Sequence, residues 1–174
     1  MAVDVAKLDI GPCRVTFDAT DLGATLDNVV VNFALKKADM KADQYGDTLL
    51  DQAISGMEVT IETSVAEIRD KDKLKKVFPS LSLIGTSPDA LEMVDKVATR
   101  QKALAKALTL HPIVEGADTN VDFDYHFYLA LPTEESAYTF SATEQGKMKI
   151  VWKVLLDTSV TPARMFRYGD KDLV

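Results

Sequence analysis

The sequence predicts a mainly β protein, either a β-sandwich or a flattened barrel of about seven strands, with one flanking α-helix. Runs in which apolar and polar residues alternate fill the first and last thirds of the chain, as expected for half-buried strands. Turn residues, chiefly Gly, Pro and Asp, separate these runs. One helical pattern lies between them, which adds a single inserted helix to the predicted fold.

Length and composition indicate one globular domain over residues 1–174, with polar N- and C-terminal arms. Hydrophobic residues make up 47% of the chain and charged residues 27%, close to the globular average, which excludes wholesale disorder. A chain of this length buries enough surface to fold without a disulfide or a metal. Cys13 is the only cysteine, so it forms neither an intrachain disulfide nor a cysteine-based zinc site.

The charge balance restricts the kind of partner. The chain has 27 acidic and 20 basic side chains, a formal net charge of −7. Affinity for a phosphate backbone comes mainly from Lys and Arg, so this composition argues against a protein that grips DNA. The first ten residues include Asp4 and Asp9, and no stretch approaches the ~20 apolar residues that span a bilayer. We therefore expect a soluble protein made in the cytoplasm, with no membrane partner.

Three strands are predicted in the first third. Arg14–Phe17 is bounded by Gly11–Pro12 and by a turn at Asp21–Gly23. Asn28–Leu35 is rich in β-branched and aromatic residues. In Gly56–Ile68 the apolar residues alternate with polar ones; they are Met57, Val59 and Ile61.

A polar segment separates the second and third of these strands. Residues 36–47 contain almost no packing side chains, so the two strands are predicted to form a hairpin with a long projecting loop at 36–50. Loops of that length without structure of their own are uncommon unless they have a function. The loop is therefore the first candidate functional segment.

The middle of the chain contains the helical patterns. Asp70–Val77 is predicted as a short helix that ends before Pro79. Ser87, Pro88 and Asp89 form a helix-start signal. An amphipathic stripe suited to covering a sheet follows it: Leu91, Val94, Val97 and Ala98. Gln101–Leu110 is ambiguous, and we favour a strand toward its end, before His111 and Pro112.

The last third returns to strand patterns. These are Asn120–Leu131, Ala137–Ala142, Lys147–Leu156 and Arg164–Tyr168. In the first of them one face is polar, formed by Asp122, Asp124, His126 and Tyr128. In the third one face is apolar, formed by Met148, Ile150, Trp152 and Val154.

Few residues suggest catalysis, and we predict no enzyme and no catalytic, cofactor-binding or metal-ligating residue. The chain has no Gly-x-Ser-x-Gly, P-loop or Gly-x-Gly-x-x-Gly motif. His126 shares a strand face with Asp122 and Asp124, which is compatible with a metal site, but an exposed polar face is the favoured interpretation. His111 and Cys13 are interpreted as structural, since Cys13 has no basic cluster nearby in sequence to activate it.

Two groups of lysines are candidate binding surfaces. Four lysines alternate with aspartates in a pattern typical of a solvated helix face: Lys71, Lys73, Lys75 and Lys76. A second row lies on one side of a predicted strand: Lys147, Lys149 and Lys153. This second row either meets an acidic neighbour or protects an edge strand against aggregation, and the sequence favours neither.

The order of these elements resembles the major tail tube proteins of long-tailed bacteriophages. The segments that carry the resemblance cover most of the chain, each a short β-pattern: Gly11–Phe17, Asp21–Thr25, Asp43–Asp47, Gly56–Thr63 with Ala66 and Glu67, Ala107–Pro112, and the Trp152 strand with Arg164–Gly169. The resemblance implies a structural virion protein that assembles into stacked hexameric rings. The rings form a hollow tube through which DNA leaves the capsid without specific binding.

The resemblance also implies partners and a contact site. The partners are other copies of the chain, the initiator or baseplate, the terminator and the tape measure protein, with assembly in the host cytoplasm and a final location in the virion tail. The projecting loop is expected to touch the neighbouring ring, with Tyr45 as an aromatic anchor. The residues expected at this contact are Asp39, Met40, Lys41, Asp43, Gln44, Tyr45, Gly46 and Asp47.

Two further features fit this role, and two other interpretations compete with it. Open edge strands are able to pair between subunits, and an acidic lumen repels phosphates so that DNA slides. The first alternative is another ring-forming assembly protein, such as a tail terminator or a type VI secretion tube component. The second is a small β-barrel that binds an apolar ligand and stays monomeric.

Overall fold

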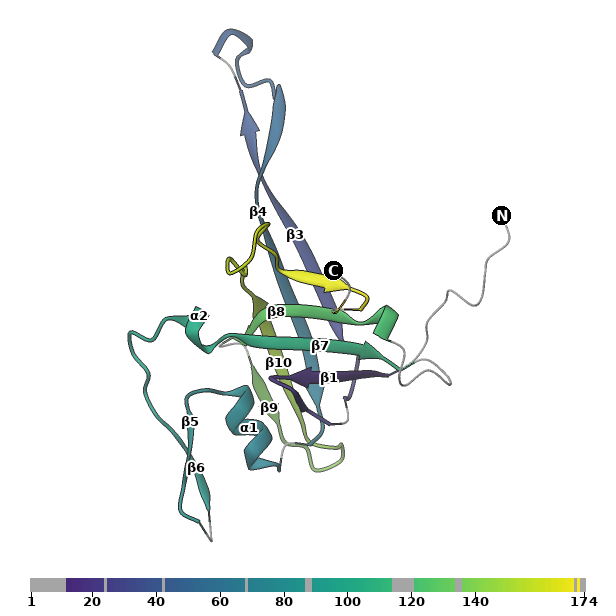
Figure 1. The fold of residues 1–174 in the computed structure, drawn as a ribbon, viewed down its shortest axis with the longest axis vertical. Coiled ribbons are helices and arrows are strands. Elements are labelled where there is room, and N and C mark those ends of the chain that lie inside the picture. Colours follow the sequence, from purple (N-terminus) through teal and green to yellow (C-terminus); the bar gives the residue numbers. More distant parts are fainter. Residues whose placement is uncertain are drawn as a thin grey trace, which may run out of the picture.

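Antiparallel strands dominate the structure, a computed structural model, and the predicted mainly β fold with a flanking helix is confirmed (Figure 1). The structure describes residues 12–23, 25–41, 43–67, 69–86, 89–113, 121–133, 136–170 and 172. The predicted polar N-terminal arm lies outside the described residues.

The described elements form two sheets and several short helices. The nine-stranded sheet contains β1 (Cys13–Phe17), β2 (Thr20–Asp21), β3 (Val30–Met40), β4 (Asp51–Val65), β7 (Lys106–Pro112), β8 (Tyr125–Pro132), β9 (Ala137–Thr139), β10 (Lys147–Val154) and β11 (Phe166–Tyr168). The two-stranded sheet contains β5 (Leu81–Ile84) and β6 (Ala90–Met93). The helices are α1 (Lys71–Val77) and α2 (Gln101–Leu104), with 3₁₀ turns η2 (Asp43–Tyr45) and η3 (Val121–Phe123).

The large sheet folds back on itself. Its main path runs β2-β1-β7-β8-β10-β4-β3, with β11 added to β8 and β9 added to β10. Strand β8 joins the two halves, because Tyr125–Phe127 pair with β7 and β11, Leu131 and Pro132 pair with β10, and Ala130 pairs with both β7 and β10. In Figure 1, β1, β7 and β8 therefore run across the direction of β3 and β4. The two halves enclose a shared core, as the layers of a sandwich do.

Trp152 lies at the centre of that core. Its side chain is 0% exposed, and its ring centroid lies 4.7 Å from that of Phe17 on the opposite half of the sheet. The indole Nε1–H donates to the hydroxyl of Thr63 at 2.9 Å, and that hydroxyl donates to the carbonyl oxygen of Ile150 at 3.5 Å. The predicted alternation places Val59 and Ile61 of β4 and Ile150 and Trp152 of β10 in the core, where all four are fully buried, but Met57 of the same predicted row is 41% exposed because it lies beyond the core.

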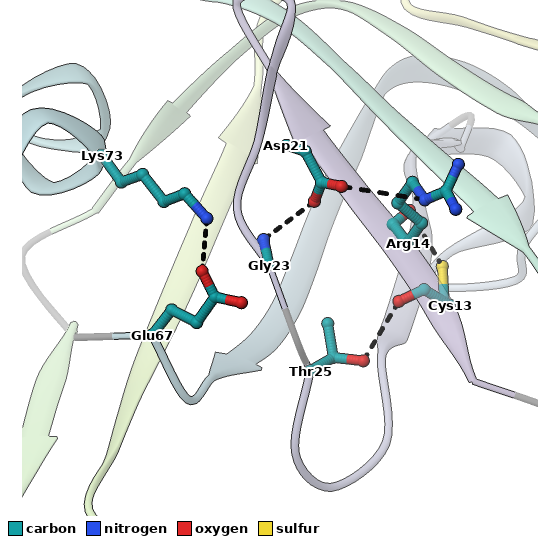
Figure 2. Close-up of polar contacts among 7 residues, drawn as sticks. All are labelled: Cys13, Arg14, Asp21, Gly23, Thr25, Glu67 and Lys73. Carbon is teal, nitrogen blue, oxygen red and sulfur yellow. Dashed lines mark hydrogen bonds and ion pairs between the residues drawn. The ribbon is translucent and has the colours of Figure 1, made fainter. Parts of the chain in front are cut away.

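Polar contacts fix the connection between β2 and β3 (Figure 2). The Asp21 carboxylate accepts the backbone N–H of Gly23 at 2.8 Å and lies 3.8 Å from Nε of Arg14. Thr25 donates its hydroxyl to the carbonyl oxygen of Cys13 at 3.0 Å. Gly23 has φ +86°, a conformation that glycine adopts without a steric penalty. The predicted turn at Asp21–Gly23 is therefore present, and it directs the chain into β3.

The predicted main helix after Ser87 is wrong. Ala90–Met93 is strand β6, which pairs with β5 in register, Leu91 opposite Leu83. The apolar residues of this segment therefore pair with strand β5 and do not cover the large sheet as a helix would. Ala98 has φ +65°, a value that a right-handed helix excludes. The predicted cap residues Ser87 and Pro88 lie outside the described residues.

The other expectations for the middle of the chain are confirmed. Helix α1 has the predicted bounds, and the Asp70 carboxylate caps it by accepting the backbone N–H groups of Asp72 and Lys73. The ambiguous segment makes one helical turn, α2, and then strand β7 up to Pro112. None of the helices in the described ranges has the length and apolar character needed to cross a membrane.

The Thr63 hydroxyl gives a testable prediction. In Thr63→Val the indole N–H of Trp152 stays buried without its acceptor, so the free energy of unfolding should fall by about 1–3 kcal/mol. Thr60→Val, on the outward face of the same strand, is the matched control and should change it by less than about 0.5 kcal/mol. Urea unfolding followed by Trp fluorescence measures the free energy of unfolding of both variants. Equal losses in the two variants would contradict the role of Thr63 as the acceptor of the indole N–H.

Gly23 gives a second prediction. A Cβ at this position would displace the carboxyl group of Glu67, which pairs with Lys73 at 2.5 Å (Figure 2). The alanine backbone would also have to keep the positive φ of Gly23, which strains any residue with a side chain. Gly23→Ala should therefore lower the free energy of unfolding by about 1–3 kcal/mol. Gly56→Ala is the control, because no atom lies within 4 Å of its added Cβ. Thermal unfolding compares the two, and a Gly23→Ala protein as stable as the control contradicts the argument.

Candidate self-association surface: the β3–β4 arm

The predicted projecting loop is mostly a two-stranded ribbon. Strands β3 and β4 pair from Val30 opposite Glu62 to Met40 opposite Asp51, so the true loop covers only 41–50. Backbone hydrogen bonds continue the ladder through the polar residues, which sequence periodicity does not reveal. The far half of this ribbon extends well beyond the rest of the molecule (Figure 1). We call residues 33–57 the arm.

A β-bulge changes the faces of the arm. Lys36 pairs with Gly56 but Lys37 pairs with Ile54, so Ser55 is an extra residue on β4. Ile54 would otherwise lie on the face opposite Met57, because they are three residues apart. The extra residue brings Ile54 to the same face as Met57.

That face is a continuation of the core surface into solvent. Val31 and Ile61 pair within the body, and the next pairs along the same face are Phe33 with Val59 and Leu35 with Met57. Exposure rises along this row to 70% for Ile54. Phe33 still touches the body, since its ring centroid lies 4.9 Å from that of Phe166. Beyond this contact the described residues leave the apolar row uncovered.

The tip contains the eight residues predicted from the sequence. Asp39 and Met40 belong to β3 rather than to a loop, and all eight residues are exposed: Asp39, Met40, Lys41, Asp43, Gln44, Tyr45, Gly46 and Asp47. Nζ of Lys41 lies 3.5 Å from Oδ1 of Asp47, and Tyr45 is 62% exposed.

Other exposed apolar residues of the arm were missed by the sequence analysis: Leu35, Leu49, Leu50, Ile54 and Met57. The adjacent pair Leu49-Leu50 in a polar segment was the available signal.

The three lysines of β10 form ion pairs with carboxylates of the same chain. Nζ of Lys149 lies 2.6 Å from Glu62, and Glu58 accepts from both Lys36 at 2.7 Å and Lys153 at 3.4 Å. Hydrogen bonding from Lys36 is the main cause that lowers the pKa of Glu58. Strand β10 lies between β8 and β4, so protection of an edge strand is the wrong interpretation. The acidic neighbours of Lys149 and Lys153 are carboxylates of β4, and Nζ of Lys147 lies 2.6 Å from Asp27, which precedes β3.

The predicted exposed polar face of Asn120–Leu131 is wrong for Asp124 and His126, which are buried; Tyr128 is half-buried, and only Asp122 is exposed. His111 Nδ1 lies 2.5 Å from Asp124 Oδ1, His126 Nδ1 lies 3.0 Å from the Thr109 hydroxyl, and both histidines and Asp124 are buried. The β7–β8 register brings these residues together, whereas Asp122 belongs to the 3₁₀ turn η3. Among the residues that the structure describes, no group of three or more His, Cys, Asp or Glu side chains is placed to hold a metal ion.

Cys13 is half-buried at the start of β1. Its thiol pKa is raised to about 11, mainly because burial disfavours the thiolate, with the negative charge of Asp124 adding to this. A backbone hydrogen bond from His111 acts in the opposite direction. The thiol therefore lacks the lowered pKa that marks a reactive cysteine.

The arm thus projects from the described part of the chain and presents exposed apolar side chains. No protein-family model matches the chain, and no curated protein matches it.

The raised pKa of Cys13 predicts slow alkylation. At pH 8 roughly one thiol in a thousand should be ionised, so the rate with iodoacetamide should rise about tenfold per pH unit between pH 8 and 10. The chain unfolded in urea is the control, and it should react at the rate of an ordinary thiol. Equal rates for the folded and unfolded chain at pH 8 would contradict the raised value.

Proposed function

We propose that this chain is a structural protein that assembles with copies of itself through the β3–β4 arm, and that it forms stacked hexameric rings of a phage-type tail tube. The observation that carries the proposal is the arm, a two-stranded ribbon that extends beyond the buried core and has exposed apolar side chains. Contiguous exposed apolar surface on a soluble protein typically marks a protein–protein contact.

The free edge of β3 supports the same proposal. Strand β3 ends the described sheet, so backbone N–H and C=O groups along Val30–Met40 are available to a further strand. Soluble monomers usually shorten or cover such an edge, because it promotes pairing with other chains. In an assembling subunit the same edge provides β-augmentation by the neighbouring copy.

The net charge fits a conduit for DNA. Each chain carries a formal charge of −7, and a ring of six copies carries six times that charge. A lumen that shares this sign repels phosphates, so that DNA passes without binding. The initiator or baseplate, the terminator and the tape measure protein are the proposed further partners, in the virion tail.

Removal of apolar side chains from the arm tip tests the proposal. The variant Tyr45→Ser, Leu49→Ser, Leu50→Ser should fold normally, because all three side chains are exposed. It should need at least about tenfold more protein to assemble, since each lost contact would have buried apolar surface. The control Gln44→Ser, Thr48→Ser should assemble like the wild type.

Sedimentation velocity and negative-stain electron microscopy of concentrated protein give the readout. Rings or tubes from the wild type, lost in the tip variant alone, support the proposal. A wild-type chain that stays monomeric at every concentration contradicts it. Single rings that never stack favour the terminator-like alternative.

A further inference from the structure

A second set of exposed apolar side chains lies between α1 and α2. We call residues 69–102 the lobe. Its strands β5 and β6 pair with each other and not with the large sheet. The exposed apolar residues are Leu83, Ile84, Met93, Val94 and Val97, of which Met93 is 73% and Val97 79% exposed.

The lobe and the arm tip carry opposite charge. Residues 69–102 include eight basic and five acidic side chains, although the whole chain is acidic with a net charge of −7. Residues 38–54 of the arm include four acidic side chains and one basic side chain. The excess of positive charge lies in residues 69–76, which have five basic and two acidic side chains, whereas residues 81–100, which carry the exposed apolar side chains, have two basic and three acidic ones. Helix α1 contacts β5 and β6, so its lysines border the exposed apolar residues of the hairpin.

The two surfaces lie at opposite ends of the molecule. In Figure 1 the arm forms one end of the long axis, and the β5–β6 hairpin forms the other. An arm is thus unable to reach the lobe of its own chain. Two arms, or two lobes, repel each other through like charge.

We infer that the arm tip of one copy docks on the lobe of the next copy, in a head-to-tail contact. This inference rests on the proposed self-association and names its receiving surface. A contact between two different surfaces is heterologous, and it repeats without limit unless rotation closes a ring. Lys96 and Arg100, which flank the exposed Val97, are the expected partners of the arm carboxylates.

Charge reversal tests this contact in both directions. The arm variant is Asp43→Lys, Asp47→Lys, and the lobe variant is Lys96→Glu, Arg100→Glu. Each alone should raise the concentration needed for assembly at least tenfold, because arm and lobe then have the same sign. An equimolar mixture of the two, and a chain carrying all four substitutions, should regain assembly because opposite charges meet again.

A third variant controls for total charge. Thr143→Lys, Glu144→Lys, Gln145→Lys changes the net charge as the arm variant does, but on the exposed β9–β10 loop. It should assemble like the wild type in sedimentation velocity. Circular dichroism and thermal unfolding verify that every variant is folded.

The outcomes separate the inference from the function on which it rests. Loss of assembly in the lobe variant alone, with recovery in the chain carrying all four substitutions, supports head-to-tail docking, because a contact between two identical arms would leave the lobe variant unaffected. A wild type that assembles while the lobe variant assembles equally well overturns the inference and leaves self-association standing. A wild type that never assembles overturns both.

Discussion

The fold depends on the burial of Trp152 between the two halves of a single bent sheet. Phe17 approaches its ring from β1, while Thr63 on β4 accepts the indole N–H, so one side chain ties both halves together. An aromatic ring of this size supplies much of the apolar surface that a small core buries, provided that its polar atom finds a partner. The two halves meet at β8, because Ala130 pairs with both Lys106 of β7 and Val154 of β10, and Leu131 and Pro132 continue along β10 beside the tryptophan.

The arm is a consequence of the same strands extending beyond that core. Near the body, β3 and β4 bury one face against the core. Farther out this face keeps uncovered apolar side chains as far as Ile54, and beyond them it is polar, with Asp39 opposite Gln52. The bulge at Ser55 preserves this character by moving Ile54 to the face of Met57. Stability of the isolated chain does not require such side chains in solvent. The proposed assembly would bury them, because apolar contacts dominate most association free energies.

Charged side chains are also distributed unevenly between the two ends of the chain's surface. The paired Lys and Glu side chains of β4 and β10 neutralise the outward face of the sheet, whereas the lobe is basic and the arm tip acidic. Opposite signs at the two ends favour one relative orientation of neighbouring copies over others. This polarity suits a subunit that stacks in one direction, as in the proposed tube.

The sequence by itself determined the mainly β class, the capped helix α1, the alternation of β4 and β10, and the presence of a projecting segment at 36–50. These features follow from local periodicity and capping chemistry, which neighbours along the chain specify. Only the tertiary structure decided that Ala90–Met93 pairs as a strand, that His111, Asp124 and His126 are buried together, and that the arm presents an uncovered apolar row from Phe33 to Ile54. Strand partners, register and bulges decide these outcomes. They depend on residues far apart in sequence, so one chain's periodicity does not contain them.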